Sequence, residues 1–229
     1  MKFRPLLGTD LSGSVGGITA SHNRGGPYFR NRAIPVNPNT PQQQTVRGFM
    51  ATLTSLWNDT LTPTERTAWD TYALNVPIPD TLGEPRNIGG LAMYVRSNVS
   101  RLQNGLPRVD TGPIIFNLGD FTNPTFDTFL GATDVFNVNF TVADDWVSED
   151  DAAMLISSSR SANPTINFFK GPYRNVAAIL GDSGAPPASP VVTLAAFSIE
   201  IGNRTFIQTR VSRADGRLSL PFRGFGLGA

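Results

Sequence analysis

The sequence predicts an α+β protein in which three kinds of structure follow one another along the chain. Residues 1–39 combine glycines, arginines and short extended patterns, which predicts an extended N-terminal arm or hairpin. Residues 40–108 carry hydrophobic residues at spacings of three and four, which is typical of amphipathic helices. Residues 109–229 contain several short segments of alternating character, and these predict an antiparallel β-sandwich domain.

The composition indicates a folded chain with few surface charges. At 229 residues the chain can bury a substantial core, and only 16% of its residues are charged, against an average of about 25% for soluble domains. The absence of cysteine excludes disulfides, thiolate metal sites and thiol nucleophiles. We expect neither a membrane span nor a secretory signal, because no apolar run approaches the roughly 18 residues that a span requires.

The arm reads as two extended runs around a turn. The runs "SVGGITASHN" and "PYFRNRAIP" flank Arg24-Gly25-Gly26, and a Gly-Gly pair is a strong turn signal. In the second run Tyr28, Arg30 and Arg32 alternate with Phe29, Asn31 and Ala33. This alternation predicts a ribbon with two different faces. Because Gly16 and Gly17 would weaken a free strand, we expect the pairing partner of the first run to lie elsewhere.

Three helices are expected between residues 40 and 105. The first begins at Thr40, with Pro41 in the first helical position, and the second begins with a capping box of Thr62 and Glu65. The third covers residues 89–105 and ends at a glycine. The residues expected to face inward are Val46, Phe49, Met50, Leu53, Leu56 and Trp57, then Trp69, Tyr72 and Ala73, and then Leu91, Met93, Tyr94, Val95, Val99 and Leu102.

Strand patterns dominate the C-terminal half. The clearest strand is residues 134–142, in which every second residue is apolar, namely Phe136, Val138, Phe140 and Val142. Further strands are expected over residues 153–159, 166–179, 191–201 and 204–212, the last joined through Asp215-Gly216 to residues 217–222 as a hairpin. The tail, residues 222–229, should be extended and free to dock.

The sequence gives little support for catalysis. The only histidine, His22, lies in the glycine-rich arm, where it is better suited to hydrogen bonding than to a catalytic triad. The "GSVGG" segment lacks the context of a phosphate-binding or dinucleotide-binding loop. We therefore expect a protein that is not an enzyme and has no cofactor.

Five carboxylates cluster in "DDWVSEDD", and several interpretations of them stay open. They are Asp144, Asp145, Glu149, Asp150 and Asp151. Their spacing does not match a calcium-binding loop, although oxygen ligands could hold such an ion. The alternatives are a solvated connection between strands, a contact for the arginine-rich arm of another subunit, and an acidic hydrolase site.

Charge is distributed unevenly along the chain. Residues 1–108 carry 11 basic and 6 acidic residues, whereas residues 109–229 carry 8 basic and 12 acidic residues. The two halves can therefore attract each other within or between chains. Arginine supplies 17 of the 19 basic residues, which suits interfaces but also follows from a GC-rich genome.

The residues expected to anchor the arm to a partner are Arg24, Tyr28, Phe29, Arg30 and Arg32. Arginines interleaved with aromatic residues are typical of surfaces that bind single-stranded nucleic acid, and they are also enriched in protein interfaces. With five positive charges and one negative charge in residues 1–40, the arm lacks the dense basic clusters of nucleic-acid-binding proteins, so a protein contact is favoured.

The segments "LSGSVGGITASHNRGGPYFRNRAIPVNPNTPQQQTVR", "LTPTERTAWDTYA" and "GLAMYVRSN" carry a resemblance to known proteins. Over residues 8–104 the chain resembles small uncharacterised proteins encoded among the structural genes of tailed bacteriophages and prophages. These share a glycine-rich start, an NRGG-Y-R-R element and an NP-TP-Q segment. The resemblance implies a place in a virion and implies no catalytic residues.

Together these expectations describe a virion structural protein, assembled in the host cytoplasm as a capsid-associated cement or decoration protein. Its partners would be major capsid or tail proteins and copies of itself. One alternative is a tail or neck protein whose immunoglobulin-like sandwich binds a host surface or a fibre, which exposed aromatic residues such as Trp146 or Tyr173 would favour. Another alternative is a nucleic-acid-binding protein that uses the same arm.

Overall fold

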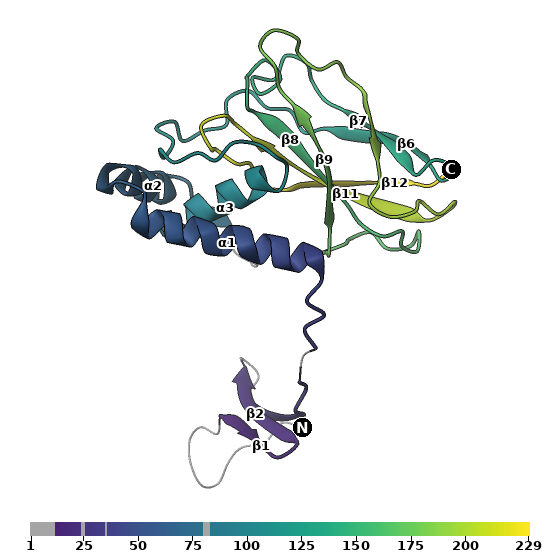
Figure 1. Cartoon of the computed structure of the whole chain (residues 1–229). Coiled ribbons are helices and arrows are strands. Elements are labelled where there is room, and N and C mark those ends of the chain that lie inside the picture. The colour runs from purple at the N-terminus through teal and green to yellow at the C-terminus, as the bar shows by residue number, and fades with distance from the viewer. Residues whose placement is uncertain (1–11, 24–25, 35, 80–82) are drawn as a thin grey trace. The chain divides into compact units, whose positions relative to one another are not determined.

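The chain forms an α+β protein with three helices and several antiparallel sheets (Figure 1). The computed structural model describes residues 12–23, 26–34, 36–79 and 83–229. The chain divides into two compact units, Met1–Pro41 and Gln42–Ala229, which we call the arm and the body. The expected boundary at residue 108 does not separate compact units, because the helices and the C-terminal strands both belong to the body.

The arm contains a three-stranded antiparallel sheet, the arm sheet, in the order β1-β2-β3. Its strands are β1 Gly13–Val15, β2 Ile18–Asn23 and β3 Gly26–Asn31. The predicted hairpin is present, since β2 pairs with β3, although its turn residues Arg24 and Gly25 lie outside the described residues. The prediction of a distant partner for the first run was wrong. Gly16, at φ 58°, and Gly17 form a second tight turn that pairs β1 with β2.

The helices begin where their local signals predict. They are α1 Pro41–Asp59, α2 Pro63–Asn75 and α3 Gly90–Leu102, and a short pair, β4 Ile78–Pro79 and β5 Pro85–Arg86, lies between α2 and α3. The Thr62–Glu65 capping box is present at the start of α2. The predicted inward residues of α2 are buried, but Met50 of α1 is largely exposed. The helical core is formed by Leu53, Trp57, Leu61, Trp69, Tyr72, Ala73, Met93 and Tyr94.

The C-terminal strands form two antiparallel sheets that share one core. The first sheet has the order β10-β7-β6, from β6 Thr125–Leu130, β7 Val135–Asn139 and β10 Val191–Leu194. The second has the order β12-β11-β8-β9, from β8 Ala153–Ser158, β9 Arg174–Leu180, β11 Arg204–Ser212 and β12 Phe222–Leu227. Side chains from both sheets meet in the core, among them Phe136, Val138, Met154, Ile156, Ile207 and Val211.

The tail is not free to dock, as the sequence suggested, because it is strand β12. Its residues pair with β11, from Arg204 opposite Leu227 to Thr209 opposite Phe222. Gly224 and Gly226 bring the backbone of β12 close to the rings of Phe126 and Phe129 in β6, a strand that the sequence analysis missed. A Cβ on Gly226 would lie 1.9 Å from the ring of Phe129, so these glycines permit the close contact.

Helix α3 joins the helical core to the second sheet. Arg101 is fully buried, and its guanidinium donates to the carbonyl oxygens of Pro107 and Arg213 at 2.8 and 2.7 Å and to the hydroxyl of Ser212 at 3.1 Å. Arg96 donates to the carbonyls of Leu218 and Ser219. In Figure 1 the three helices gather at one side of the C-terminal strands. These contacts make helices and strands one body.

Candidate interaction site in the N-terminal arm

The arm sheet has one apolar face and one polar face. Residues paired across neighbouring strands share a face, and residues alternate between faces along each strand, so the register assigns every side chain. The apolar face carries Val15, Ile18, Ala20, Pro27 and Phe29, together with two polar residues, His22 and Asn31. The polar face carries Ser14, Thr19, Ser21, Tyr28 and Arg30. The hydroxyls of Ser14 and Thr19 lie 2.8 Å apart on the polar face.

The described part of the arm has no core. No described residue between positions 12 and 40 is buried. On the apolar face Val15 is 86% exposed and Ile18 is 52% exposed. Three strands are stable on their own only when a hydrophobic face is covered. The apolar face of the arm sheet therefore gains free energy when another surface covers it.

The predicted anchor residues do not lie on one face. Tyr28 and Arg30 lie on the polar face, and Arg32 follows directly after β3. Phe29 lies on the apolar face, opposite to them. Arg24 lies outside the described residues. The arm thus offers an apolar contact on one side and a basic, aromatic contact on the other.

The clustered carboxylates of the body are engaged by their own chain. The carboxylate of buried Asp144 accepts from the backbone N–H of Thr122 at 3.1 Å and from Nε1 of Trp146 at 3.4 Å. Asp145 accepts from the backbone N–H of Asp120 at 3.1 Å. Trp146, which a binding tip would expose, is only 1% exposed, so it does not favour the host-binding alternative.

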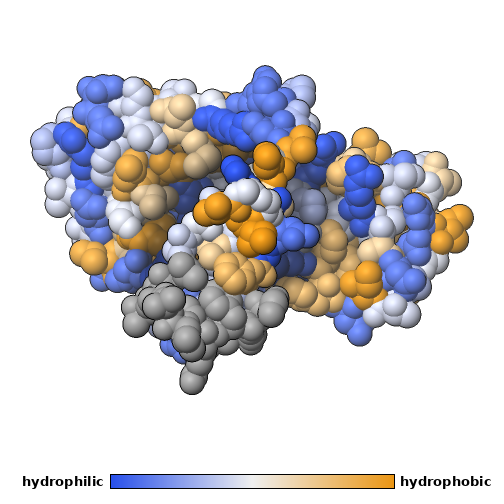
Figure 2. Space-filling model, turned by 90° about the horizontal axis from the view of Figure 1, so that it is seen from below, coloured by the Kyte–Doolittle hydropathy of each residue, from blue (hydrophilic) through white to orange (hydrophobic). Residues whose placement is uncertain are grey.

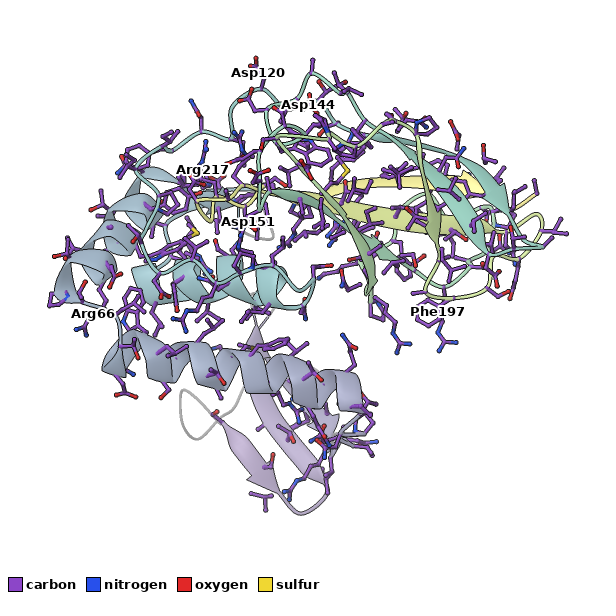
Figure 3. The ribbon with its side chains drawn as sticks, turned by 45° about the horizontal axis from the view of Figure 1, so that its top comes forward. Arg66, Asp120, Asp144, Asp151, Phe197 and Arg217 are labelled. Atoms are coloured by element: carbon purple, nitrogen blue, oxygen red, sulfur yellow. The ribbon has the colours of Figure 1, made fainter. Side chains whose placement is uncertain are left out.

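The remaining carboxylates do not complete an ion site. Asp150 accepts from the backbone N–H and hydroxyl of Ser183 at 2.7 and 2.9 Å, and these bonds hold the pKa of its carboxyl below the ordinary value. Asp151 is exposed, at φ 61°, and lies apart from Asp144 (Figure 3). Among the described residues, no three acidic or histidine side chains could hold a metal ion together. Most carboxylates of the predicted acidic cluster therefore form hydrogen bonds or ion pairs with other loops of the same chain.

Two arginines that the sequence analysis missed form ion pairs that hold these loops together. Arg213 pairs with Glu149 and, at 3.4 Å, with Asp145, while Arg217 pairs with Asp215 at 2.7 Å. Both arginines also donate to backbone carbonyls of the segment before β6, at residues 117 and 118. The sequence could have indicated these two arginines, because they flank the predicted Asp215-Gly216 turn and so lie at the end of one hairpin.

Charge is segregated in the body more sharply than the two halves of the sequence indicate. Residues 109–151 contain nine acidic residues and no basic residue. Residues 152–229 contain eight basic and three acidic residues. The arm, residues 1–41, contains five basic residues and one acidic residue. The acidic segment is therefore the part of the chain whose charge best complements the arm.

The body also exposes apolar side chains. A groove of about 530 Å³ beside α2 is lined by Pro63, Thr67, Thr71, Pro113, Ile114 and Phe116, among others. The hydroxyls of Thr67 and Thr71 donate to carbonyls of their own helix, and Ile114 is 85% exposed. Figure 2 shows hydrophobic side chains at several separate places on the face that it draws.

No family model, curated protein or solved structure matches this chain. Within the described residues, none of the helices has the length and apolar character that crossing a bilayer requires. The features of the chain that bear on its function are therefore the two faces of the arm sheet and the charges of the body.

Proposed function

We propose that this protein is a non-enzymatic structural component of a phage particle, specifically a capsid-associated cement or decoration protein. The observation that carries the proposal is the arm sheet, a separate compact unit with an apolar face and no buried residue between positions 12 and 40 among those described. Such a sheet becomes stable when a neighbouring polypeptide covers its apolar face. The resemblance of residues 8–104 to phage structural proteins supports another virion protein as this neighbour.

The charges support neighbouring copies and other virion proteins as the partners. A basic arm and an acidic segment at residues 109–151 belong to the same chain, so copies arranged by symmetry can place one against the other. Fixing the backbone costs about 1–2 kcal/mol per residue, so each arm contributes little net free energy. Many arms repeated over a lattice contribute together, which is how a cement protein strengthens a shell.

We also propose that residues 125–227 form an immunoglobulin-like sandwich. When β6 to β12 are named A to G in chain order, the sheets read A-B-E and D-C-F-G. Constant-type immunoglobulin domains have the sheets A-B-E-D and C-F-G, so this order differs only in the sheet to which the fourth strand belongs. The strand order and the shared core support the proposal.

Nucleic-acid binding is the second candidate, because Tyr28 and Arg30 share the polar face of the arm sheet. A protein contact is favoured, since binding through that face alone would leave the apolar face exposed. Retention of the full chain on DNA distinguishes the two. A nucleic-acid-binding arm requires affinity that falls steeply with salt, whereas the cement proposal predicts little retention near physiological salt.

A truncation tests the proposal directly. A chain that begins at Thr40 keeps the start of α1 and the whole body. We expect it to unfold with the same midpoint as the body of the full chain, because both hydrophobic cores lie in the body. We also expect it to be absent from purified phage particles that incorporate the full chain. A truncated chain that joins particles at full occupancy would contradict the role of the arm.

A further inference from the structure

A groove runs between the outermost strands of the two body sheets. β9 ends one sheet and β10 ends the other, and the two strands contact each other without pairing. Residues 174–179 and 191–196 line a groove of about 410 Å³ between them. The last strand of a sheet presents a row of backbone N–H and C=O groups that lack a neighbouring strand, so two such rows border the groove. At the end of β10 the N–H of Ala196 is already used, because it donates to the hydroxyl of Ser158 at 2.9 Å.

The side chains along this groove are mainly apolar and partly exposed. Val192 and Leu194 of β10 are 64% and 61% exposed. Leu180, which follows the last groove residue of β9, is 55% exposed. Proteins usually protect edge strands with lysine, proline or a covering segment. β10 carries none of the charges that normally prevent pairing with another chain. An exposed apolar edge of this kind is typical of a strand that accepts a partner.

A pair of stacked arginines lies at one end of the groove. The Cζ atoms of Arg160 and Arg174 lie 4.7 and 5.0 Å from the ring centroid of Phe197. Arg174 is the first residue of β9, and Phe197 follows directly after the groove residue Ala196. Stacking on the ring holds each guanidinium in place while its edge remains able to donate hydrogen bonds. Figure 3 shows Phe197 at the outside of the body.

These two arginines have no carboxylate partner among the described residues. No described residue accepts a hydrogen bond from either guanidinium, and both side chains are exposed. Asp134, the acidic residue that contacts this loop, already accepts from the hydroxyl of Ser198 at 3.0 Å and the backbone N–H of Ile199 at 2.7 Å. Two adjacent cations without a counter-charge form a site for an oxyanion.

We propose that this groove binds an extended, acidic segment of a partner polypeptide by strand addition. The backbone of the segment pairs with β9 or β10, its apolar side chains lie along Val192 and Leu194, and a carboxylate binds Arg160 and Arg174. The arm of a second copy is a poor occupant, because its charge has the same sign as that of the arginine pair. A nucleic acid is also disfavoured, since the groove is aliphatic and its nearest ring, Phe197, is already stacked.

The groove belongs to the body, so its binding is tested separately from that of the arm. The full chain is used to select binders from a displayed library of random nine-residue peptides. We expect enriched sequences to alternate apolar residues and to contain aspartate or glutamate. A synthetic copy of the tightest-binding peptide, with both termini blocked to remove their charges, should shift the backbone NMR signals of β9 and β10. Replacing its acidic residue by the amide should weaken binding at least about tenfold, the loss expected for a charge-assisted hydrogen bond.

Matched variants assign the effect to the arginine pair. Arg160→Gln with Arg174→Gln should lower the affinity for the acidic peptide to that for the amide peptide. Arg66→Gln with Arg86→Gln removes the same charge from the helical region and should change neither affinity. The proposal is overturned if no peptide is enriched, if enriched peptides lack acidic residues, if the amide peptide binds equally well, or if a single-stranded oligonucleotide displaces the peptide from β9 and β10.

Discussion

The arm sheet and the body sheets are built from the same kind of antiparallel pairing, but among the described residues only the body sheets have a core. In the body, Phe136 and Val138 of one sheet and Ile207 of the other are fully buried between two layers. In the arm, Val15 and Ile18 occupy the equivalent position on an apolar face and are largely exposed. Strand pairing therefore sets register in both regions, whereas stability requires a second layer, which the described residues supply to the body sheets and not to the arm sheet.

The largest expected difference between the regions comes from deleting one aromatic side chain in each. Trp69→Ala removes a fully buried ring that packs against Tyr72 and Tyr94 and donates to the carbonyl of Asp110. We expect the free energy of unfolding of the body to fall by about 3–5 kcal/mol in urea titrations. Phe29→Ala should change it by less than about 0.5 kcal/mol. Equal losses would mean that arm and body unfold as one unit.

A charge placed on either face of the arm sheet sharpens the distinction between its faces. Ile18→Asp puts a carboxylate on the apolar face and should weaken assembly by about 2–3 kcal/mol, or at least about 30-fold. Thr19→Asp adds the same charge to the opposite face and should weaken assembly much less. Both variants should keep the unfolding midpoint of the body. Sedimentation of the assembled particles measures the bound fraction. Equal losses of binding in the two variants would show that the apolar face does not form the contact.

Two glycines in the body separate packing from backbone strain. Gly216 has φ 92°, and a Cβ there would lie 3.1 Å from the Trp69 ring, whereas Gly202 has φ 77° with no atom within 4 Å. Gly202→Ala should cost about 1 kcal/mol from the backbone alone. Gly216→Ala should cost about 1–2 kcal/mol more, because the helical core must adjust. Equal effects would show that the hairpin turn does not pack tightly on α2.

The smallest expected effect is a change in acid stability of the body. The pKa of Asp150 is lowered in the fold by hydrogen bonds from Ser183, so the unfolded chain binds more protons at this residue near pH 4. Its stabilising contribution is complete above the ordinary pKa of about 4 and is lost as the pH falls through the folded value. Asp150→Asn should therefore make stability fall less steeply with acid. Thermal unfolding between pH 6 and 3 measures the slope, and an unchanged slope would exclude this contribution.

The sequence predicted the elements whose signals are local. The capping box at Thr62 and Glu65, the start of α1 at Pro41 and the burial of Trp69 all depend on neighbours within one or two helical turns. The hairpin between β2 and β3 was also predictable, because a glycine pair and alternating side chains specify it.

The elements that the sequence did not predict depend on distant contacts. Glycine disfavours strands, so "FRGFGLGA" reads as a loose tail until the rings of Phe126 and Phe129 are seen against Gly224 and Gly226. The contacts of the acidic cluster also depend on a distant residue, because Arg213 pairs with two of its carboxylates, Asp145 and Glu149. Residues 166–173 have a strand-like composition but no partner strand, and they form irregular structure.

The most direct test of the central claim is hydrogen–deuterium exchange at the backbone amides of β1, β2 and β3, followed in the isolated chain and in the assembled particle. We predict that these amides exchange almost as fast as in an unfolded peptide when the chain is alone, while β8 and β11 remain protected, because no described residue of positions 12–40 is buried. In the particle the arm amides should become protected. Arm amides as protected as those of β8 in the isolated chain would contradict the claim that a partner stabilises the arm.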